Sequence, residues 1–238
     1  MFGWRARIGY VYPAPLLCSQ DMNRILPEGV VWVYATLDIR SLVPEEFERI
    51  FSMWASGAEQ VASRDADFII LSGTAVHYHI GYEKSEELCR RIEKSTGIPT
   101  MLNATAHINA LRAFSANKII LVSPFEAERN EEEKKSLEKI GFDVINTKGA
   151  GLLYNNEFSK LPPYTSYRLA KEAFYETPGA DAILIECPGW EVLANVDALE
   201  RDLGKPVVSA IAADLWAPLT ALNIKGPIRG YGKLLEML

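Results

Sequence analysis

The segment ADFIILSG at residues 66–73 decides the fold, because ADAILIEC at residues 180–187 repeats its pattern. Each copy reads Ala-Asp, then a short apolar run, then the point where a strand is expected to end. Gly73 closes the first copy and Cys187 closes the second. A second echo, GIPT against GKPV, follows the two copies in the same order. The repeat predicts two similar α/β halves, with a thiol at only one of two equivalent positions.

Composition narrows the class of protein. The chain has 238 residues, 48% of them hydrophobic, enough for one large α/β domain or two small ones. No apolar stretch reaches the ~18–20 residues that cross a bilayer, so no membrane partner is expected. The formal net charge is −6 with scattered basic residues, which argues against a nucleic-acid partner. Cys18, Cys89 and Cys187 form no CxxC pair, which favours a reducing, cytoplasmic setting.

Short apolar runs alternate with amphipathic segments, the pattern of βα units that build a parallel sheet. The predicted strands are 8–12, 30–35, 68–72, 118–123, 143–145, 182–186 and 206–209. The predicted helices are 44–63, 84–95, 104–115, 126–140, 166–176, 192–202 and 212–222. The fold class is therefore α/β.

We place the domain limits where the pattern restarts, with an N-terminal half at 1–116 and a C-terminal half at 117–215. The remaining segment, 216–238, is expected to return to the N-terminal half. Its stretch GPIRGYG at 226–232 has the composition of a loop, and we expect it to cover a site.

Cys187 is the first candidate for chemistry. It follows an apolar strand and precedes Pro188-Gly189, a turn that leads toward a helix. A thiol in such a place is near backbone N–H groups that favour the thiolate. The plain alternative is a small buried hydrophobic residue, as expected for Cys89. The repeat favours a functional role for Cys187.

The equivalent turn in the first half is Ser72-Gly73-Thr74-Ala75. Gly73 allows a ligand to approach the backbone, and the Thr74 hydroxyl with the next N–H groups can hold a carboxylate. In open parallel sheets ligands bind beyond the carboxyl ends of the strands, where residues 123–125 and 186–189 also fall. We therefore expect one cleft.

Three histidines are present, of which two lie close to this turn. His77 and His79 form a His-x-His pair, but no third ligand stands at a recognisable spacing, so no metal site is predicted. His77 or Tyr78 is a candidate to line the cleft. His107 lies in an apolar helical pattern and is expected to be structural. Nucleotide, serine-hydrolase and zinc-protease motifs are absent from the sequence, so no cofactor is predicted.

Several short motifs together point to a known group of enzymes. They are Ile8-Gly9, Pro13, LSGT at 71–74, Thr105-Ala106, Leu111-Arg112-Ala113, Cys187, 204–209, Trp216 and Gly230-Tyr231-Gly232. In these residues the chain resembles the aspartate/glutamate racemase superfamily, most closely its arylmalonate decarboxylase family, with maleate isomerases as more distant relatives. The resemblance implies two Rossmann-like halves related by a pseudo-twofold axis, with the site in the cleft between them.

The resemblance also implies a division of labour between the halves. Racemases and isomerases of the superfamily typically carry a cysteine in each half, one for each face of the substrate carbon. The decarboxylase branch has glycine in the first half and keeps the second cysteine. Gly73 with Cys187 matches that branch, and a small carboxylate is the implied substrate.

This chain departs from the decarboxylase pattern around the expected carboxylate pocket. Thr74 is kept, but Ala75 replaces a serine, Phe125 a tyrosine and Pro188 a glycine. Each lost oxyanion donor can cost about 3–4 kcal/mol in barrier. The candidates to replace them are Ser123, His77, Tyr78 and Tyr231, and the expected substrate-binding set is Pro13, Gly73, Thr74, Ala75, His77, Tyr78, Ser123, Phe125, Pro188 and Gly189.

The sequence thus leads to a cofactor-independent decarboxylase of a substituted malonate or related acid, with Cys187 protonating an enediolate. One thiol facing a glycine cannot deprotonate one face and reprotonate the other unaided. Two alternatives stay open. One is a racemase or maleate-type isomerase in which His77, Tyr78 or Cys18 serves the second face. The other is a carboxylate-binding protein without catalysis. Substrate and oligomeric state are left open.

Overall fold

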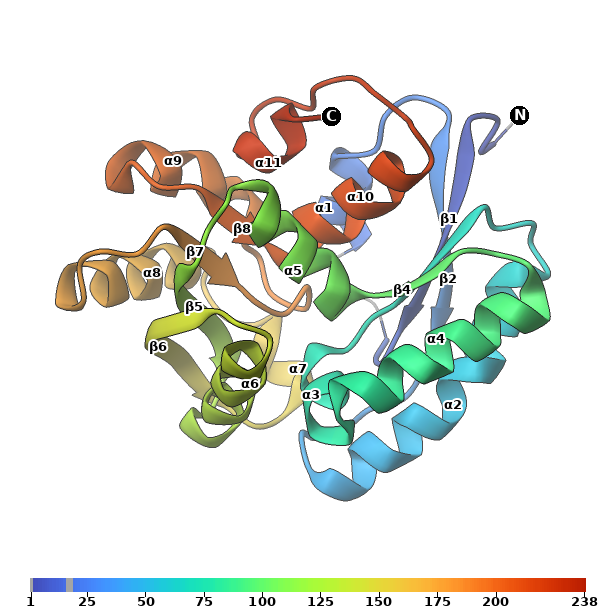
Figure 1. Cartoon of the computed structure of the whole chain (residues 1–238), viewed down its shortest axis with the longest axis horizontal. Coiled ribbons are helices and arrows are strands. Elements are labelled where there is room, and N and C mark those ends of the chain that lie inside the picture. The colour runs from blue at the N-terminus through green and yellow to red at the C-terminus, as the bar shows by residue number, and fades with distance from the viewer. Residues whose placement is uncertain (1, 16–18) are drawn as a thin grey trace.

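The protein, described here from a computed structural model that covers residues 2–15 and 19–238, contains two parallel sheets (Figure 1). The first has the order β2-β1-β3-β4, with strands Ala6–Tyr12 (β1), Val30–Thr36 (β2), Phe68–Leu71 (β3) and Thr100–Leu102 (β4). The second has the order β6-β5-β7-β8, with strands Lys118–Phe125 (β5), Asp143–Leu152 (β6), Ala182–Ile185 (β7) and Val207–Ser209 (β8). The shared order confirms the two α/β halves that the repeat predicts.

Helices cover the sheets and fill the space between them. They are Ser19–Arg24 (α1), Pro44–Ala62 (α2), Thr74–Ile80 (α3), Tyr82–Thr96 (α4), Asn103–Ala113 (α5), Ala127–Lys139 (α6), Asn155–Phe158 (α7), Tyr164–Glu176 (α8), Leu193–Leu203 (α9), Ala210–Ala221 (α10) and Lys233–Glu236 (α11). None of those described is long and apolar enough to cross a membrane. The central strands β3 and β7 are buried along their whole length, as expected of strands covered on both faces.

Helix α2 shows how local sequence sets an element. Pro44 occupies its first turn, where a missing N–H costs nothing, and Glu45 and Glu46 follow at the positive end of the helix dipole. Its apolar face carries Phe47 and Trp54, both fully buried against the first sheet. Burying each such side chain contributes roughly 1.5–3 kcal/mol.

Two elements near the site differ from the sequence expectation. Strand β4 was not predicted, because its three residues are too few to give a periodic signal. Helix α3 is not among the predicted helices, since Val76, His77 and Tyr78 are poor helix formers. All three side chains are buried in the structure, so packing against α2 and α6 overrides their weak propensity.

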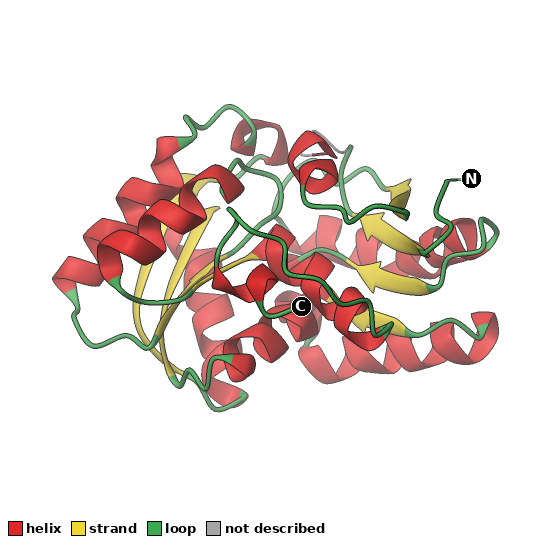
Figure 2. Cartoon of the chain, turned by 90° about the horizontal axis from the view of Figure 1, so that it is seen from above, coloured by secondary structure: helices red, strands yellow, loops and turns green. Residues whose placement is uncertain are grey.

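Helices α5 and α10 pack against each other (Figure 1). In the view from above, helices lie between the two groups of strands (Figure 2). α5 also contacts β4 of the first sheet and both β7 and β8 of the second, while α10 contacts β3 and β8. A second link joins the halves near the surface, where Ser41 and Tyr154 form an antiparallel bridge. There the Leu42 N–H donates to the Leu153 carbonyl at 3.1 Å. The halves are therefore joined by both core packing and backbone bonding.

The last segment of the chain contacts both halves. The Arg5 guanidinium donates to the Lys225 carbonyl at 3.2 Å, a contact with the first half. The Gly232 N–H donates to Asp197 at 2.7 Å and the Lys233 N–H to Glu200 at 2.9 Å, both on α9 of the second half. The 226–232 loop thus lies against α9 instead of covering the cavity described below, and the domain limits stay a prediction.

Candidate functional site

A small cavity lies where the carboxyl ends of β1, β3, β5 and β7 meet. Its lining is Tyr12, Pro13, Ile39, Leu42, Ser72, Gly73, Thr74, Ala75, Val76, Phe125, Asn155, Phe158, Cys187 and Pro188. The centres of water-sized molecules can occupy about 40 Å³ of it. The site is therefore tight, and it joins the two turns that the repeat singled out.

Cys187 sits on a sharp turn directly after β7. Its side chain is 7% exposed and its φ is 72°, in the left-handed region that a residue with a Cβ rarely adopts. Such a conformation costs of order 1–3 kcal/mol. The Gly189 N–H points at the Cys187 Sγ at 3.3 Å, and the Trp190 indole holds the Glu186 carbonyl at 2.7 Å. The surrounding bonds thus fix a strained turn that presents the sulfur to the cavity.

Gly73 forms the matching turn after β3, and its backbone conformation disfavours any residue with a side chain. Its φ of 133° and ψ of 68° lie in a region that only glycine visits readily. A Cβ there would lie 3.3 Å from Trp54 Cζ2 and 3.4 Å from Pro13 Cγ. Thr74 follows at once as the first residue of α3. The first half therefore offers bare backbone and a hydroxyl where the second half offers a thiol.

Of the other expected substrate-binding residues, Pro13, Ala75, Phe125 and Pro188 also line the cavity. Phe125 packs edge-on against Phe158, with ring centroids 5.6 Å apart, and makes an apolar wall. Gly189 lies behind the thiol, where a Cβ would approach both the Cys187 sulfur and the Tyr12 hydroxyl.

Ser123, His77 and Tyr78 are not among the described residues that line the cavity. Ser123 is fully buried, and its hydroxyl bonds to Asn130 and to the Phe125 N–H, which shapes the end of β5. The His77 ring donates to the Leu71 carbonyl at 3.0 Å and stacks on Trp54. Burial lowers the pKa of His77 to about 3, so the ring is neutral. Tyr78 is buried in the same short helix, and burial raises its pKa.

The remaining cysteines and the tail tyrosine do not join the described site. Cys89 is buried in α4 as expected, and burial raises its pKa. Cys18 lies outside the described residues. Tyr231 lies in the segment that packs on α9.

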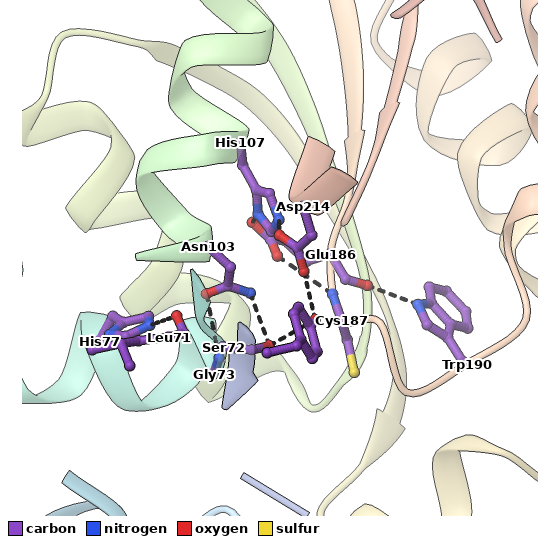
Figure 3. A network of polar contacts seen from close by, with 11 residues as sticks. Leu71, Ser72, Gly73, His77, Asn103, His107, Glu186, Cys187, Trp190 and Asp214 are labelled. Carbon is purple, nitrogen blue, oxygen red and sulfur yellow. Dashed lines mark hydrogen bonds and ion pairs between the residues drawn. The ribbon is translucent and has the colours of Figure 1, made fainter. Parts of the chain in front are cut away.

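A buried polar network connects the two turns (Figure 3), and its centre is His107, which the sequence predicts to be a structural residue. His107 on α5 bonds through Nδ1 to Glu186 Oε1 at 2.9 Å and through Nε2 to Asp214 Oδ1 at 3.0 Å. All three side chains are fully buried. Burial alone would lower the pKa of His107, but Glu186 and Asp214 outweigh it and raise the pKa to about 10. The ring is therefore a cation between two acids.

The sequence signals for these partners are weak but present. Glu186 directly precedes the thiol, Asp214 is the one acid in the apolar helix α10, and His107 follows Asn103 by four residues, on the same face of α5. Asn155, a polar residue of the cavity lining, carries no sequence signal that we recognise. No group of three His, Cys, Asp or Glu side chains in the described ranges is arranged to hold a metal ion.

Another buried acid, Glu133 on α6, lies near the first turn. Both of its carboxyl oxygens are buried, and neither makes a close hydrogen bond with a described residue. Burial and the Glu186 carboxylate raise the pKa of Glu133 well above its usual value, while the Thr74 hydroxyl favours the charged form. Burial therefore favours the neutral form of Glu133, the acid that lies near Thr74.

Known proteins are similar to this chain in both sequence and architecture. The sequence profile of the family described as arylmalonate decarboxylase matches residues 9–235. The arylmalonate decarboxylase of Bordetella bronchiseptica is 26% identical over 227 residues, covering 95% of this chain and 94% of that protein. A maleate isomerase of Geobacillus stearothermophilus is 25% identical over 250 residues, covering 97% of each chain.

Solved structures agree with this relation. A liganded double mutant of arylmalonate decarboxylase, with a Gly-to-Cys and a Cys-to-Ser change, superposes with a TM-score of 0.91 at 24% identity, over 98% of this chain and all of that one. A Nocardia farcinica maleate isomerase mutant with a covalently bound succinylcysteine intermediate gives 0.88 at 21% identity, over 98% and 99% of the chains. These likenesses concern the fold. Because the profile spans nearly the whole sequence, the chain belongs to the arylmalonate decarboxylase family.

Proposed function

We propose that this protein is a cofactor-independent decarboxylase of a substituted malonate, with Cys187 as the proton donor. One observation carries the proposal: Cys187 and Gly73, the equivalent residues of the two halves, line the same cavity. Because Gly73 has no side chain, the described lining of the cavity offers a thiol to one face of the substrate only. A reaction that needs one protonation suits this arrangement better than one that needs a thiol on each face.

The proposed chemistry balances with the residues at hand. The bond from the malonate Cα to one carboxylate breaks, CO₂ leaves, and its electron pair passes into an enediolate on the other carboxylate. The Cys187 S–H then gives its proton to Cα, forming the new C–H bond and a thiolate, which regains a proton from water. A donor of this kind must be a thiol at the moment of transfer.

The cavity supplies groups for binding as well as for proton transfer. The Thr74 hydroxyl and the first N–H groups of α3, which have no acceptor within the helix, are suited to hold the retained carboxylate. Ile39, Leu42 and the Phe125 ring provide apolar walls for the departing carboxylate, where poor solvation favours loss of charge as CO₂. The limited volume favours a small substituent on the malonate over a bulky aromatic one.

The test is turnover of a graded series of malonates in heavy water, from methylmalonate to phenylmalonate. We expect a monoacid with one deuterium at Cα, formed as a single enantiomer where the substituents allow one. Cys187→Ala should remove the activity while the protein keeps its circular dichroism spectrum. No release of CO₂ from any malonate at high enzyme concentration would reject the proposal.

An isomerase of the maleate type is the second candidate, favoured by the maleate isomerases among the relatives. In that case maleate would be converted to fumarate with Cys187 as nucleophile, and a Cys187 adduct would appear in the mass of the intact protein. Incubation with maleate, followed by chromatography and mass spectrometry, separates the two reactions. Thermal stabilisation by dicarboxylates without either product would instead indicate binding alone.

A further inference from the structure

The most unusual feature outside the cavity is the fully buried group His107, Glu186 and Asp214, which we call the ionic triad. Its members come from three elements: α5, the end of β7 and α10. The ring makes a 2.9 Å bond to one acid and a 3.0 Å bond to the other, so both ring nitrogens are engaged. The mechanism proposed above uses none of the three. A buried cation held by two acids requires an explanation, because desolvation makes such groups costly.

On one side the ionic triad reaches the thiol turn. The second oxygen of Glu186, Oε2, accepts the N–H of Cys187 at 3.3 Å. This bond acts on the residue whose backbone is held at a φ of 72°. The Trp190 indole fixes the Glu186 carbonyl from the other direction. Glu186 therefore connects His107 to the backbone that aims the sulfur.

On the other side the ionic triad reaches the glycine turn through three further residues (Figure 3). The second oxygen of Asp214, Oδ2, accepts the Tyr10 hydroxyl at 2.6 Å, and that hydroxyl lies 3.0 Å from Ser72 Oγ. The Asn103 amide donates to Ser72 Oγ at 3.4 Å and accepts the Gly73 N–H at 3.3 Å. All of these side chains are fully buried.

The network thus makes an unbroken polar path from the Gly73 N–H to the Cys187 N–H, and its centre is the His107 ring. The two ends are the strained turns that face each other in the cavity. Packed side chains alone could hold each turn, but this path sets one turn relative to the other. A displacement of about 1 Å of a reacting group can cost roughly 10²-fold in rate.

We propose that the ionic triad is a positioning device, with His107 as the positioning residue that sets the Cys187 sulfur relative to the Gly73 turn. This inference rests on the proposed function for its kinetic test. Loss of the ring contacts should let the thiol turn shift, so that proton delivery becomes slower and less selective between the two faces of the enediolate.

The test compares His107→Gln with Glu200→Gln, a matched control. Glu200 is also a buried acid that accepts two N–H groups, from Val207 and Lys233, but it lies outside the network. For His107→Gln we expect a fall in kcat of roughly 10²-fold, a KM within about threefold and a lower enantiomeric excess of the product. Glu200→Gln should lower the melting temperature while kcat and enantiomeric excess stay as in the wild type.

A second variant guards against loss of folding. Asp214→Asn keeps the shape of the side chain and an acceptor for Tyr10, so it should fold and show the same changes in milder form. Unchanged kcat and enantiomeric excess in folded His107→Gln or Asp214→Asn would overturn the inference, and the ionic triad would then be structural only.

The result stays readable if the proposed function fails. Should the wild type turn over no malonate, the rate of Cys187 alkylation by iodoacetamide, followed on the Cys187 peptide, reports the placement of the sulfur directly. A several-fold change in that rate for His107→Gln, with none for Glu200→Gln, supports the positioning role. Equal rates in all three proteins reject it.

Discussion

The turn after β3 and the turn after β7 occupy the same place in two sheets of the same strand order, yet they do different things. At the first, Gly73 is followed immediately by helix α3, so the cavity meets backbone and a hydroxyl. At the second, α9 begins only at Leu193, and the intervening residues fold back so that Gly189 contacts the Cys187 sulfur. A repeated scaffold thus carries two unlike ends, one suited to hold an anion and the other to supply a proton.

The largest expected effect comes from replacing the Cys187 thiol, the group that distinguishes the second turn from the first. Cys187→Ser replaces the sulfur by a hydroxyl that is far less acidic, and kcat for malonate decarboxylation should fall by ~10²–10⁴-fold. Initial rates at saturating substrate measure this. Cys89→Ala, at a cysteine buried in α4, is the control and should stay within about twofold of wild type. If the Cys187→Ser enzyme were as fast as the control, the thiol would not be the functional difference between the two turns.

The glycine turn can be tested by adding a single methyl group. Gly73→Ala forces a side chain into a backbone region that essentially only glycine occupies, which should lower the free energy of unfolding by about 1–3 kcal/mol. The new Cβ would also press on Trp54 and Pro13, so activity should fall. Gly97→Ala, at a left-handed position with open space around it, should lose some stability and keep full activity. Urea unfolding and initial rates distinguish the two variants.

A smaller effect, on the free energy of unfolding, is expected from substituting Glu133, an acid of the second half that lies near the first turn. Burial disfavours the ionised form of this carboxyl, which is the form in the unfolded chain at pH 7, and Glu133→Gln avoids that cost of folding. The variant should therefore have a higher free energy of unfolding than the wild type at pH 7. Because a raised folded pKa favours stability at low pH, the gain should shrink as the pH falls toward 4.5. Glu131→Gln, at an exposed position on the same helix, should change little.

The two buried histidines should make the free energy of unfolding fall both at high pH, through His107, and at low pH, through His77. His107 has its pKa raised to about 10, so its contribution is complete below pH 6.5 and is lost as the pH rises toward 10. His77 has its pKa lowered to about 3, so its contribution is complete above pH 6.5 and is lost as the pH falls toward 3. Each fall has a slope of at most about 1.4 kcal/mol per pH unit from that group. Urea titrations across this range measure both, and His77→Gln should flatten the fall at low pH only.

Much of the scaffold could be predicted from the sequence, because buried parallel strands give short apolar runs and amphipathic helices give a hydrophobic repeat of about 3.6 residues. The repeat that ends at Gly73 and Cys187 marks both turns in the sequence alone. The short elements β4 and α3 could not be predicted, because their formation depends on packing and not on a local sequence pattern. His77 and Tyr78 are candidates to line the cavity because they follow the Gly73 turn in the sequence, but helix α3 turns both side chains into the core.

The ionic triad shows why the rest could not be read from the chain. Glu186 and Asp214 are separated from His107 by 79 and 107 residues, so no local period connects them. Only the packing of α5 between the sheets makes an isolated histidine and two isolated acids neighbours. The identity of each residue was visible, but its partner was not.

The junction of α5 with the second half has a consequence for how the molecule comes apart. His107 precedes residue 116, whereas Glu186 and Asp214 follow it. If either half unfolded alone, the half that stays folded would therefore keep buried charge without its partner. Such a partly melted species is costly, and heating should therefore give one sharp calorimetric transition instead of two. Duplicated architecture does not here mean independent folding, because each copy completes the interior of the other.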